Sequence, residues 1–206
     1  FIATRRAEGN ALDVRLGVPI QFLSPVDGAV EAVATDGRRF RARRVVLALA
    51  VPQALRLLEP IEIRVTGGRE LIQRLAAVDC LPCLTVAAGY DLRVPVPPWD
   101  IDFPRDTTIL HSISHDSGKR RNPEQRVFVY QARPHYSRAF LNAPEGVWVA
   151  DVLWEAGEVL GSWAARPAWT YGHCWSWARL HANDPGLGDS TWVNVDGGGS
   201  IGLCGD

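Results

Sequence analysis

A run of six apolar residues without alternation, Val45 to Ala50, is the clearest hydrophobic segment in the first part of the chain. Such a run predicts a strand that is buried on both faces, as strands of parallel sheets are. Pro52 then ends the strand, and the segment from Gln53 to Leu58 predicts a short helix. Open α/β sheets bind their ligands where such a strand ends. The segment from Arg41 to Leu58 is therefore a candidate binding site.

Alternating apolar positions upstream of this run predict a small antiparallel meander. Residues 14–26 alternate loosely around Pro19, which is typical of an edge or irregular strand. Residues 30–34 alternate more regularly and lead into Asp36 and Gly37, a strong hairpin signal. The meander thus leads the chain into the apolar strand that follows it.

The rest of the chain mixes predicted helices and strands. Apolar residues recur at helical spacing in segments 69–78 and 144–160. The core face of the second helix is predicted to consist of Val152, Leu153, Ala156, Val159 and Leu160. Strands are predicted at 84–90, 109–114, 127–132 and 201–204, and loops at 94–99, 116–123 and 183–188. The pattern therefore predicts a protein with both helices and sheets.

Composition and charge exclude several classes of protein. The chain has 206 residues, of which 47% are hydrophobic, so it can bury one large core or two small ones. A formal net charge of −1 provides no electrostatic attraction to nucleic acid or to an anionic membrane. No apolar run approaches the roughly 18–20 residues that span a bilayer. The chain contains no methionine, and we expect it to be a piece of a longer protein.

Four cysteines in a chain of this length do not predict a disulfide framework, which favours a cytoplasmic location. Cys80 and Cys83, with His173 elsewhere, leave a zinc or thiol-redox site open beside buried structural thiols. The other cysteines, Cys174 and Cys204, are far apart in sequence. We therefore predict no metal site. The chain also lacks G-x-S-x-G and H-E-x-x-H, so hydrolase and metalloprotease functions have no support.

Several short segments, taken in order, resemble the FAD-dependent amine oxidase superfamily and, within it, the renalase-like branch. Each is weak alone, but their order and spacing along the chain are those of the family. The segments are residues 50–58, 79–86, 117–120, 131–137, 173–178 and 201–206.

This resemblance implies a fold of the α+β or α/β class. A partial FAD-binding domain, with the meander and the apolar strand, is expected at residues 1–58. An antiparallel-sheet substrate domain backed by helices is expected at 59–190, and a return strand to the FAD-binding domain at 191–206. The glycine-rich turn that leads into a helix and holds the FAD pyrophosphate is missing, because no predicted helix follows Gly197 to Gly199.

The resemblance also implies the residues of a site. The expected FAD contacts are Ile20, Ala48, Ala50, Pro52, Gly205 and Asp206. The expected substrate contacts are Tyr171, His173, Trp175 and Trp177, whose alternating aromatic rings can stack a planar group, and Lys119 in a basic loop. For each of them, ordinary core packing or a solvated surface position remains the alternative. No side chain is identified as a catalytic base.

The implied reaction is hydride transfer from a reduced nicotinamide-type substrate to FAD, with oxygen as the final acceptor. Classical amine oxidases carry a lysine on the strand that enters the substrate domain, whereas this chain has Pro82 and Cys83 there, which favours the renalase-like branch. Two alternatives stay open: an amine-oxidising or desaturase-like flavoenzyme, and a non-catalytic domain that binds a planar ligand or a partner.

Overall fold

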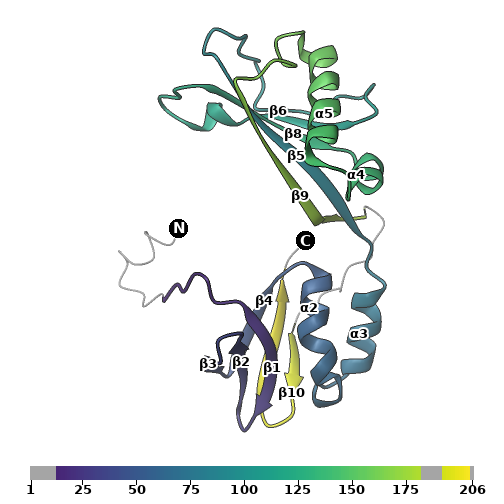
Figure 1. Ribbon diagram of the computed structural model, residues 1–206. Coiled ribbons are helices and arrows are strands. Elements are labelled where there is room, and N and C mark those ends of the chain that lie inside the picture. The colour runs from purple at the N-terminus through teal and green to yellow at the C-terminus, as the bar shows by residue number, and fades with distance from the viewer. Residues whose placement is uncertain (1–12, 182–191, 205–206) are drawn as a thin grey trace. The chain divides into compact units, whose positions relative to one another are not determined.

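The computed structural model describes residues 13–181 and 192–204 (Figure 1). Within these residues the chain forms two compact units. Unit 1 comprises residues 13–77 and 192–204, and unit 2 comprises residues 78–181. Each unit has a hydrophobic core of its own. No helix among the described residues is both long and apolar enough to cross a membrane.

Unit 1 begins with the predicted meander. Strands β1 (Ile20–Val26), β2 (Ala29–Ala34) and β3 (Arg39–Ala42) form an antiparallel sheet in the order β1-β2-β3. Gly28 and Gly37 form the two turns with φ of 70° and 84°, a backbone conformation that favours glycine. The edge position of β1 and the hairpin after β2 confirm the predictions for this region.

A second sheet of unit 1 contains the apolar strand. Strand β4 (Arg44–Ala48) pairs in parallel with β11 (Gly199–Cys204), and β11 pairs antiparallel with β10 (Trp192–Val195), which the pattern did not predict. The prediction that β4 is buried on both faces is wrong. Leu47 is buried, whereas Val46 is 54% exposed. The strand packs against the core with one face only. An apolar run in the sequence cannot distinguish burial on one face from burial on both faces.

The helical segments of unit 1 pack into one core with both sheets. They are α2 (Val51–Leu58), the 3-10 helix η1 (Glu59–Arg64) and α3 (Gly68–Ala76). Leu58 of α2, Leu75 of α3, and Val30 and Ile201 of the sheets are at most 1% exposed. The structure thus places η1 and α3 in unit 1, although they follow the predicted boundary at Leu58. The functional boundaries at 58/59 and 190/191 stay a prediction.

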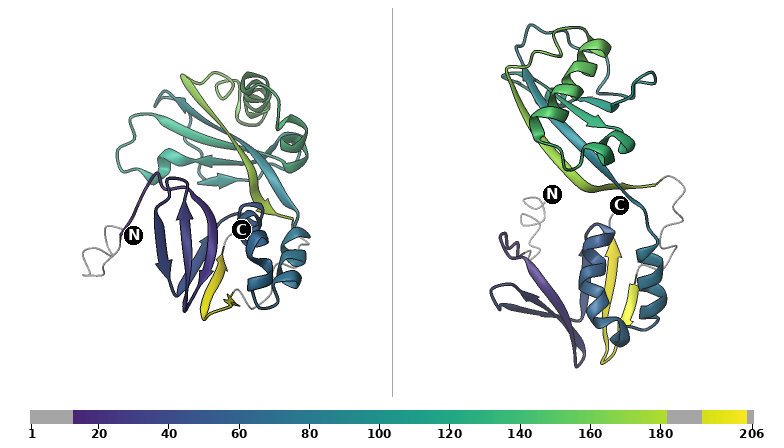
Figure 2. Two further views of the ribbon diagram at one scale, coloured as in Figure 1. Left: turned by 60° about the horizontal axis from the view of Figure 1, so that its bottom comes forward. Right: turned by 45° about the vertical axis from the view of Figure 1, so that its right-hand side comes forward.

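Unit 2 is built on a single antiparallel sheet in the order β6-β7-β8-β5-β9 (Figure 2). Its strands are β5 (Cys80–Tyr90), β6 (Ile101–Asp102), β7 (Leu110–His115), β8 (Arg126–Ala132) and β9 (Trp169–Leu180). This sheet confirms the predicted antiparallel fold. Its last strand, β9, lies at the edge and carries the aromatic segment.

Two helices accompany this sheet, and α5 (Glu145–Leu160) covers one of its faces. The second, α4 (Pro134–Phe140), was not predicted. Ser137 of α4 accepts a hydrogen bond from the Leu84 backbone N–H at 3.0 Å and so fixes α4 to β5.

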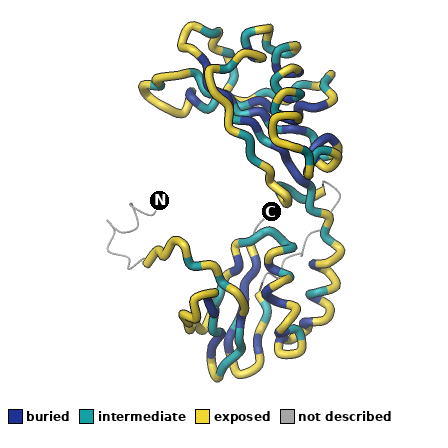
Figure 3. Tube along the Cα trace, viewed as in Figure 1, coloured by how far each residue is buried: buried dark blue, intermediate teal, exposed yellow. Residues whose placement is uncertain are grey.

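The core face of α5 differs in part from the prediction. Val152 and Ala156 are buried as predicted, but Leu153, Val159 and Leu160 are only half-buried. Trp148 and Glu155 are buried as well. Figure 3 colours the whole chain by burial. The buried face of α5 is therefore not the purely apolar face that the sequence predicted.

Candidate functional site

The face of the unit 2 sheet opposite α5 carries exposed aromatic side chains. In β5, Leu84, Val86 and Ala88 are fully buried in the core that α5 completes. The residues between them point to the other face, because side chains alternate along a strand. We call this surface the open face and define it by Cys83, Thr85, Ala87, Gln131, Tyr171, His173 and Trp175.

The β5–β9 register brings three of the predicted substrate residues together on the open face. Tyr171, His173 and Trp175 pair with Ala87, Thr85 and Cys83 of β5. The rings of Tyr171 and His173 are stacked at 6.4 Å between centroids, and those of His173 and Trp175 meet edge-on at 4.3 Å. Tyr171 is 62% and Trp175 51% exposed. We call these three rings the aromatic ladder; their exposed π surface can bind a planar group.

Trp177 lies outside the regular pairing of this strand. The register passes from Cys83 opposite Trp175 to Leu81 opposite Arg179, so β9 bulges against Pro82. Proline has no N–H to donate to a sheet, and strands bulge at such positions. The predicted regular alternation from Tyr171 through Trp177 therefore ends at Trp175, and the substrate role of Trp177 stays a prediction.

Sequence reasoning missed polar residues on and beside the open face. Arg179 follows the bulge, and its Nη2 donates to Cys83 Sγ at 3.5 Å. Ser112 of β7 hydrogen-bonds Gln131 of β8, with 3.1 Å between its Oγ and Oε1 of the amide. Arg179 lies beyond the bulge, so no regular spacing in the sequence indicated its place.

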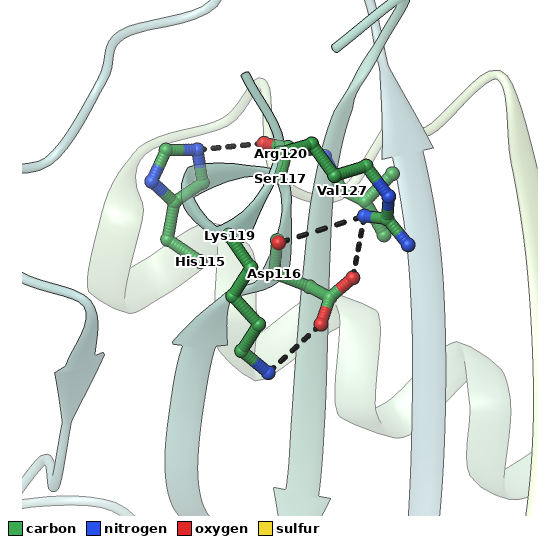
Figure 4. A network of polar contacts seen from close by, with 6 residues as sticks. All are labelled: His115, Asp116, Ser117, Lys119, Arg120 and Val127. Carbon is green, nitrogen blue, oxygen red and sulfur yellow. Dashed lines mark hydrogen bonds and ion pairs between the residues drawn. The ribbon is translucent and has the colours of Figure 1, made fainter. Parts of the chain in front are cut away.

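The basic loop with Lys119 pairs two of its charges with one carboxylate. In the 3-10 helix η2 (Asp116–Lys119), Lys119 Nζ lies 2.9 Å from Oδ1 of Asp116, and Arg120 Nη1 lies 2.6 Å from Oδ2 (Figure 4). The hydrogen bond from Lys119, followed by that from Arg120, holds the pKa of Asp116 below its usual value. This loop follows the end of β7, whereas Trp175 lies beside the opposite end of β5. The structure therefore does not group Lys119 with the aromatic ladder, and its substrate role stays a prediction.

A buried histidine supports the base of this loop. His115 is 5% exposed and stacks on Phe128 at 5.0 Å. Ser117 Oγ lies 2.8 Å from His115 Nε2 and accepts a hydrogen bond from the Val127 N–H at 3.2 Å (Figure 4). Because Val127 donates to it, the Ser117 hydroxyl is free to donate to an unprotonated Nε2. Burial and then Arg126 lower the pKa of His115, against the opposing effects of Asp100 and Asp116.

We expect unit 2 to lose stability as the pH falls through the ordinary pKa of histidine, about 6.5. At this pH the unfolded chain takes up a proton, whereas folded His115 stays unprotonated until its lowered pKa is reached. The stabilising contribution of neutral His115 is therefore fully present above pH 6.5, roughly the ordinary pKa. One such proton changes the free energy of unfolding by at most about 1.4 kcal/mol per pH unit.

Denaturation of the parent and of His115→Gln between pH 5 and 7.5, roughly the range in which histidine titrates, measures this slope. The slope should become shallower in the variant. It should be unchanged in His135→Gln, since His135 is exposed. Equal slopes in the parent and His115→Gln would contradict the assignment. The pKa of His111 is also lowered, but His111 is present in all three proteins and adds the same pH dependence to the free energy of unfolding of each.

In unit 1, three predicted cofactor residues lie at the carboxyl end of the parallel strand pair. Ala48 pairs with Cys204 at the end of β4. Ala50 is the N-cap of α2, and its carbonyl accepts from the N–H groups of Gln53 and Ala54 at 2.9 and 3.1 Å. Pro52 lies in the first turn of the helix. These residues thus stand where the strand ends and the helix begins, at Val51 and not at Gln53, and their contact with FAD stays a prediction.

The other predicted cofactor residues are placed separately. Ile20 begins β1 opposite Ala34, beside a register shift, and packs partly against the core of unit 1. Gly205 and Asp206 lie outside the described residues. Gly199 starts strand β11, so the preceding glycines lead into a strand and not into a helix.

The strand-to-helix turn fits one wall of a dinucleotide site. Ala48 is exposed and Ala50 half-buried, so that only methyl groups stand between a ligand and the backbone at this strand end. Ligands of open α/β sheets bind at this edge. The phosphate-holding turn is a separate element, and no G-x-G-x-x-G turn leading into a helix is present among the residues described here. The described residues thus fit part of an FAD site.

The cysteines do not gather into a site. All four are free, and Cys83 is buried, but Cys174 and Cys204 are exposed, so their expected burial is wrong. No group of three or more histidine, cysteine or acidic side chains that could hold a metal occurs within residues 13–181 and 192–204.

The fold of the chain is similar to that of solved amine oxidases. A putrescine oxidase triple mutant matches with a TM-score of 0.67 and 18% identity, over 99% of this chain and 46% of that one. Wild-type putrescine oxidase bound to putrescine gives 0.66, with the same identity and coverage. Cyclohexylamine oxidase from Brevibacterium oxydans IH-35A gives 0.58 at 13% identity, over 92% and 42%. The chain spans less than half the length of these structures.

Family membership follows from the sequence match. The model of the flavin containing amine oxidoreductases matches residues 3–183. The chain belongs to this family. No match was found among curated proteins. The superfamily and its flavin cofactor were therefore predicted correctly, whereas the renalase-like branch stays a prediction.

Proposed function

We propose that the protein is an FAD-dependent oxidoreductase that oxidises a small-molecule amine. Family membership is the observation that carries this proposal. The amine oxidases with the same fold support it, and one of them was solved with putrescine bound. Unit 1 contributes to holding the cofactor, and the open face of unit 2 binds the substrate.

The roles of the residues follow from their positions. Ala48, Ala50 and Pro52 would contact FAD at the strand end, with Ile20 in the meander. When bound, FAD supplies the hydride acceptor. The aromatic ladder would orient a planar part of the substrate and keep water from it. The open face as defined contains no carboxylate, so we assign no catalytic base.

A second candidate is a reduced nicotinamide dinucleotide as substrate, as in the renalase-like branch. The nearly parallel rings of exposed Tyr171 and half-buried His173 favour it, because they can stack a nicotinamide ring. The open face also lacks a lysine, which distinguishes it from the classical amine oxidases that the resemblance describes. We further propose a cytoplasmic location, since all four cysteines are free.

Flavin reduction in the absence of oxygen separates these candidates. The full chain is loaded with FAD, and flavin absorbance is followed after adding an aromatic amine or reduced nicotinamide dinucleotide. Loss of absorbance with the amine supports the first proposal, and loss with the dinucleotide alone supports the second. A chain that holds FAD but is reduced by neither compound would contradict both.

A further inference from the structure

Three basic side chains come together at the end of the open face where β9 bulges. His111 lies in β7, Arg133 directly after β8 and Arg179 in β9. The Arg133 N–H donates to the Ile109 carbonyl at 2.6 Å, and Cys83 Sγ lies 3.7 Å from the Ala132 carbonyl. The Arg179 guanidinium reaches the same sulfur. These contacts connect neighbouring strands at the same end of the sheet. We call His111, Arg133 and Arg179 the cationic corner.

Neither arginine of the cationic corner has a carboxylate partner among the described residues. Arg133 donates to the Pro104 carbonyl at 2.9 Å and contacts the Thr107 hydroxyl at 3.1 Å, both neutral, and its Nε is buried without a partner. Arg179 contacts a thiol, which is a weak acceptor. By contrast, three other arginines of unit 2 pair with acids at 2.6 to 3.1 Å, namely Arg93, Arg120 and Arg138.

The field in this corner is positive. Burial lowers the pKa of His111, and Arg179 and Arg133 lower it further. Like charges brought close together disfavour protonation of the imidazole. The ring also packs edge-on against Phe103 at 5.7 Å, so its position is defined. A ligand that enters here therefore meets two permanent positive charges and a histidine held toward its neutral form.

The positive field selects ligands by charge. A guanidinium binds a carboxylate through two parallel hydrogen bonds, and Arg179 has donors that no described residue uses. A cationic group would be repelled at the same place. Cys83 is both the contact of Arg179 and the register partner of Trp175. The anion position thus adjoins the aromatic ladder.

We propose that Arg179 binds a carboxylate of the substrate while the aromatic ladder holds its planar ring. The substrate class is then an aromatic compound that bears a carboxylate, such as an aromatic amino acid, and not a polyamine. Arg133 and His111 tune the field without contacting the carboxylate. This inference rests on the proposed function only in calling the bound molecule a substrate.

Equilibrium binding to the full chain tests the proposal without any flavin chemistry. Phenylacetate and 2-phenylethylamine share one ring and carry opposite charges. Their binding is followed by quenching of tryptophan fluorescence, since Trp175 is exposed. We expect phenylacetate to bind at least about tenfold more tightly, which is ~1.4 kcal/mol. Equal or tighter binding of the amine, or no binding of either ligand, would overturn the proposal.

Two variants locate the anion contact. Arg179→Gln should weaken phenylacetate binding at least about tenfold. Arg179→Lys should retain part of the affinity, since it keeps the charge and loses the paired hydrogen bonds. Arg93→Gln is the matched control and should bind as the parent does, because Arg93 is an exposed loop residue. Parent-like binding by Arg179→Gln would refute the role of Arg179.

The two proposals fail in different ways. Arg179-dependent binding of phenylacetate by a chain whose flavin no amine reduces would leave the anion site standing and remove the amine oxidase function. Amine-driven flavin reduction together with a preference for phenylethylamine would leave the function standing and remove the anion site.

Discussion

Replacing Glu155 with alanine is expected to destabilise unit 2 by about 2–5 kcal/mol. Glu155 is a buried carboxylate of α5 that accepts four hydrogen bonds from one loop. Thr108 donates its N–H and hydroxyl at 2.8 and 3.0 Å, and the N–H groups of Ile109 and Leu110 donate at 2.9 and 2.6 Å. Alanine would leave the buried N–H groups of Ile109 and Leu110 unsatisfied, whereas Thr108 is exposed and can bond to water instead. Because β7 begins at Leu110, the loss affects the strand that carries His111.

Chemical denaturation followed by far-UV circular dichroism measures this effect. Glu155→Gln should lose less stability than Glu155→Ala, since the amide keeps one oxygen acceptor. Glu158→Ala on the same helix is the control and should stay within about 0.5 kcal/mol of the parent, because Glu158 is exposed. A Glu155→Ala variant as stable as the control would show that the carboxylate does not hold the loop.

Replacing Gly172 with alanine is expected to destabilise unit 2 by about 1–3 kcal/mol. A Cβ atom at Gly172 would lie 2.6 Å from Cη2 of Trp148 and 2.8 Å from Cγ of Glu145. Trp148 is 4% exposed and cannot move away without disturbing the core. Gly172 stands between Tyr171 and His173, so displacing it from α5 also shifts the aromatic ladder. The variant should therefore lose both stability and affinity for a planar ligand.

Gly146→Ala on α5 is the matched control for this substitution. A Cβ there would meet nothing within 4 Å. Alanine should stabilise the helix by about 0.5–1 kcal/mol, since glycine is the poorer helix former. Melting temperatures of the two variants should thus move in opposite directions. A Gly172→Ala protein that melts at or above the parent temperature would contradict the close packing of β9 on α5.

Periodicity and turn chemistry predicted the elements whose signals are local. The meander with its Asp36-Gly37 hairpin and the helix after Pro52 needed only neighbouring residues to be identified. The burial of Val46 could not be predicted in this way, because it depends on what covers the second face of the sheet. For the same reason a tetrapeptide as short as β10, residues 192–195, gave no signal of its own.

The part of the candidate site that the sequence predicted is the one whose residues recur at a regular spacing along a single strand. The alternating spacing of Tyr171, His173 and Trp175 indicated one aromatic face, and the structure brings these rings together. Arg179 was missed because the bulge opposite Pro82 decides its place. Glu155 was missed because an acidic residue on a helix is usually solvated, and its partners lie more than forty residues away in sequence.

The absorption spectrum of the purified chain, recorded after incubation with FAD and gel filtration, tests whether the chain binds FAD at the strand-to-helix turn of unit 1. We expect flavin bands to elute with the protein, and we expect Ala48→Trp, which fills the strand-to-helix turn, to weaken FAD binding at least about tenfold. Ala76→Trp, at an exposed position of α3, should retain the cofactor as the parent does. A parent chain that elutes without flavin, or equal FAD affinity in both variants, would contradict the assignment.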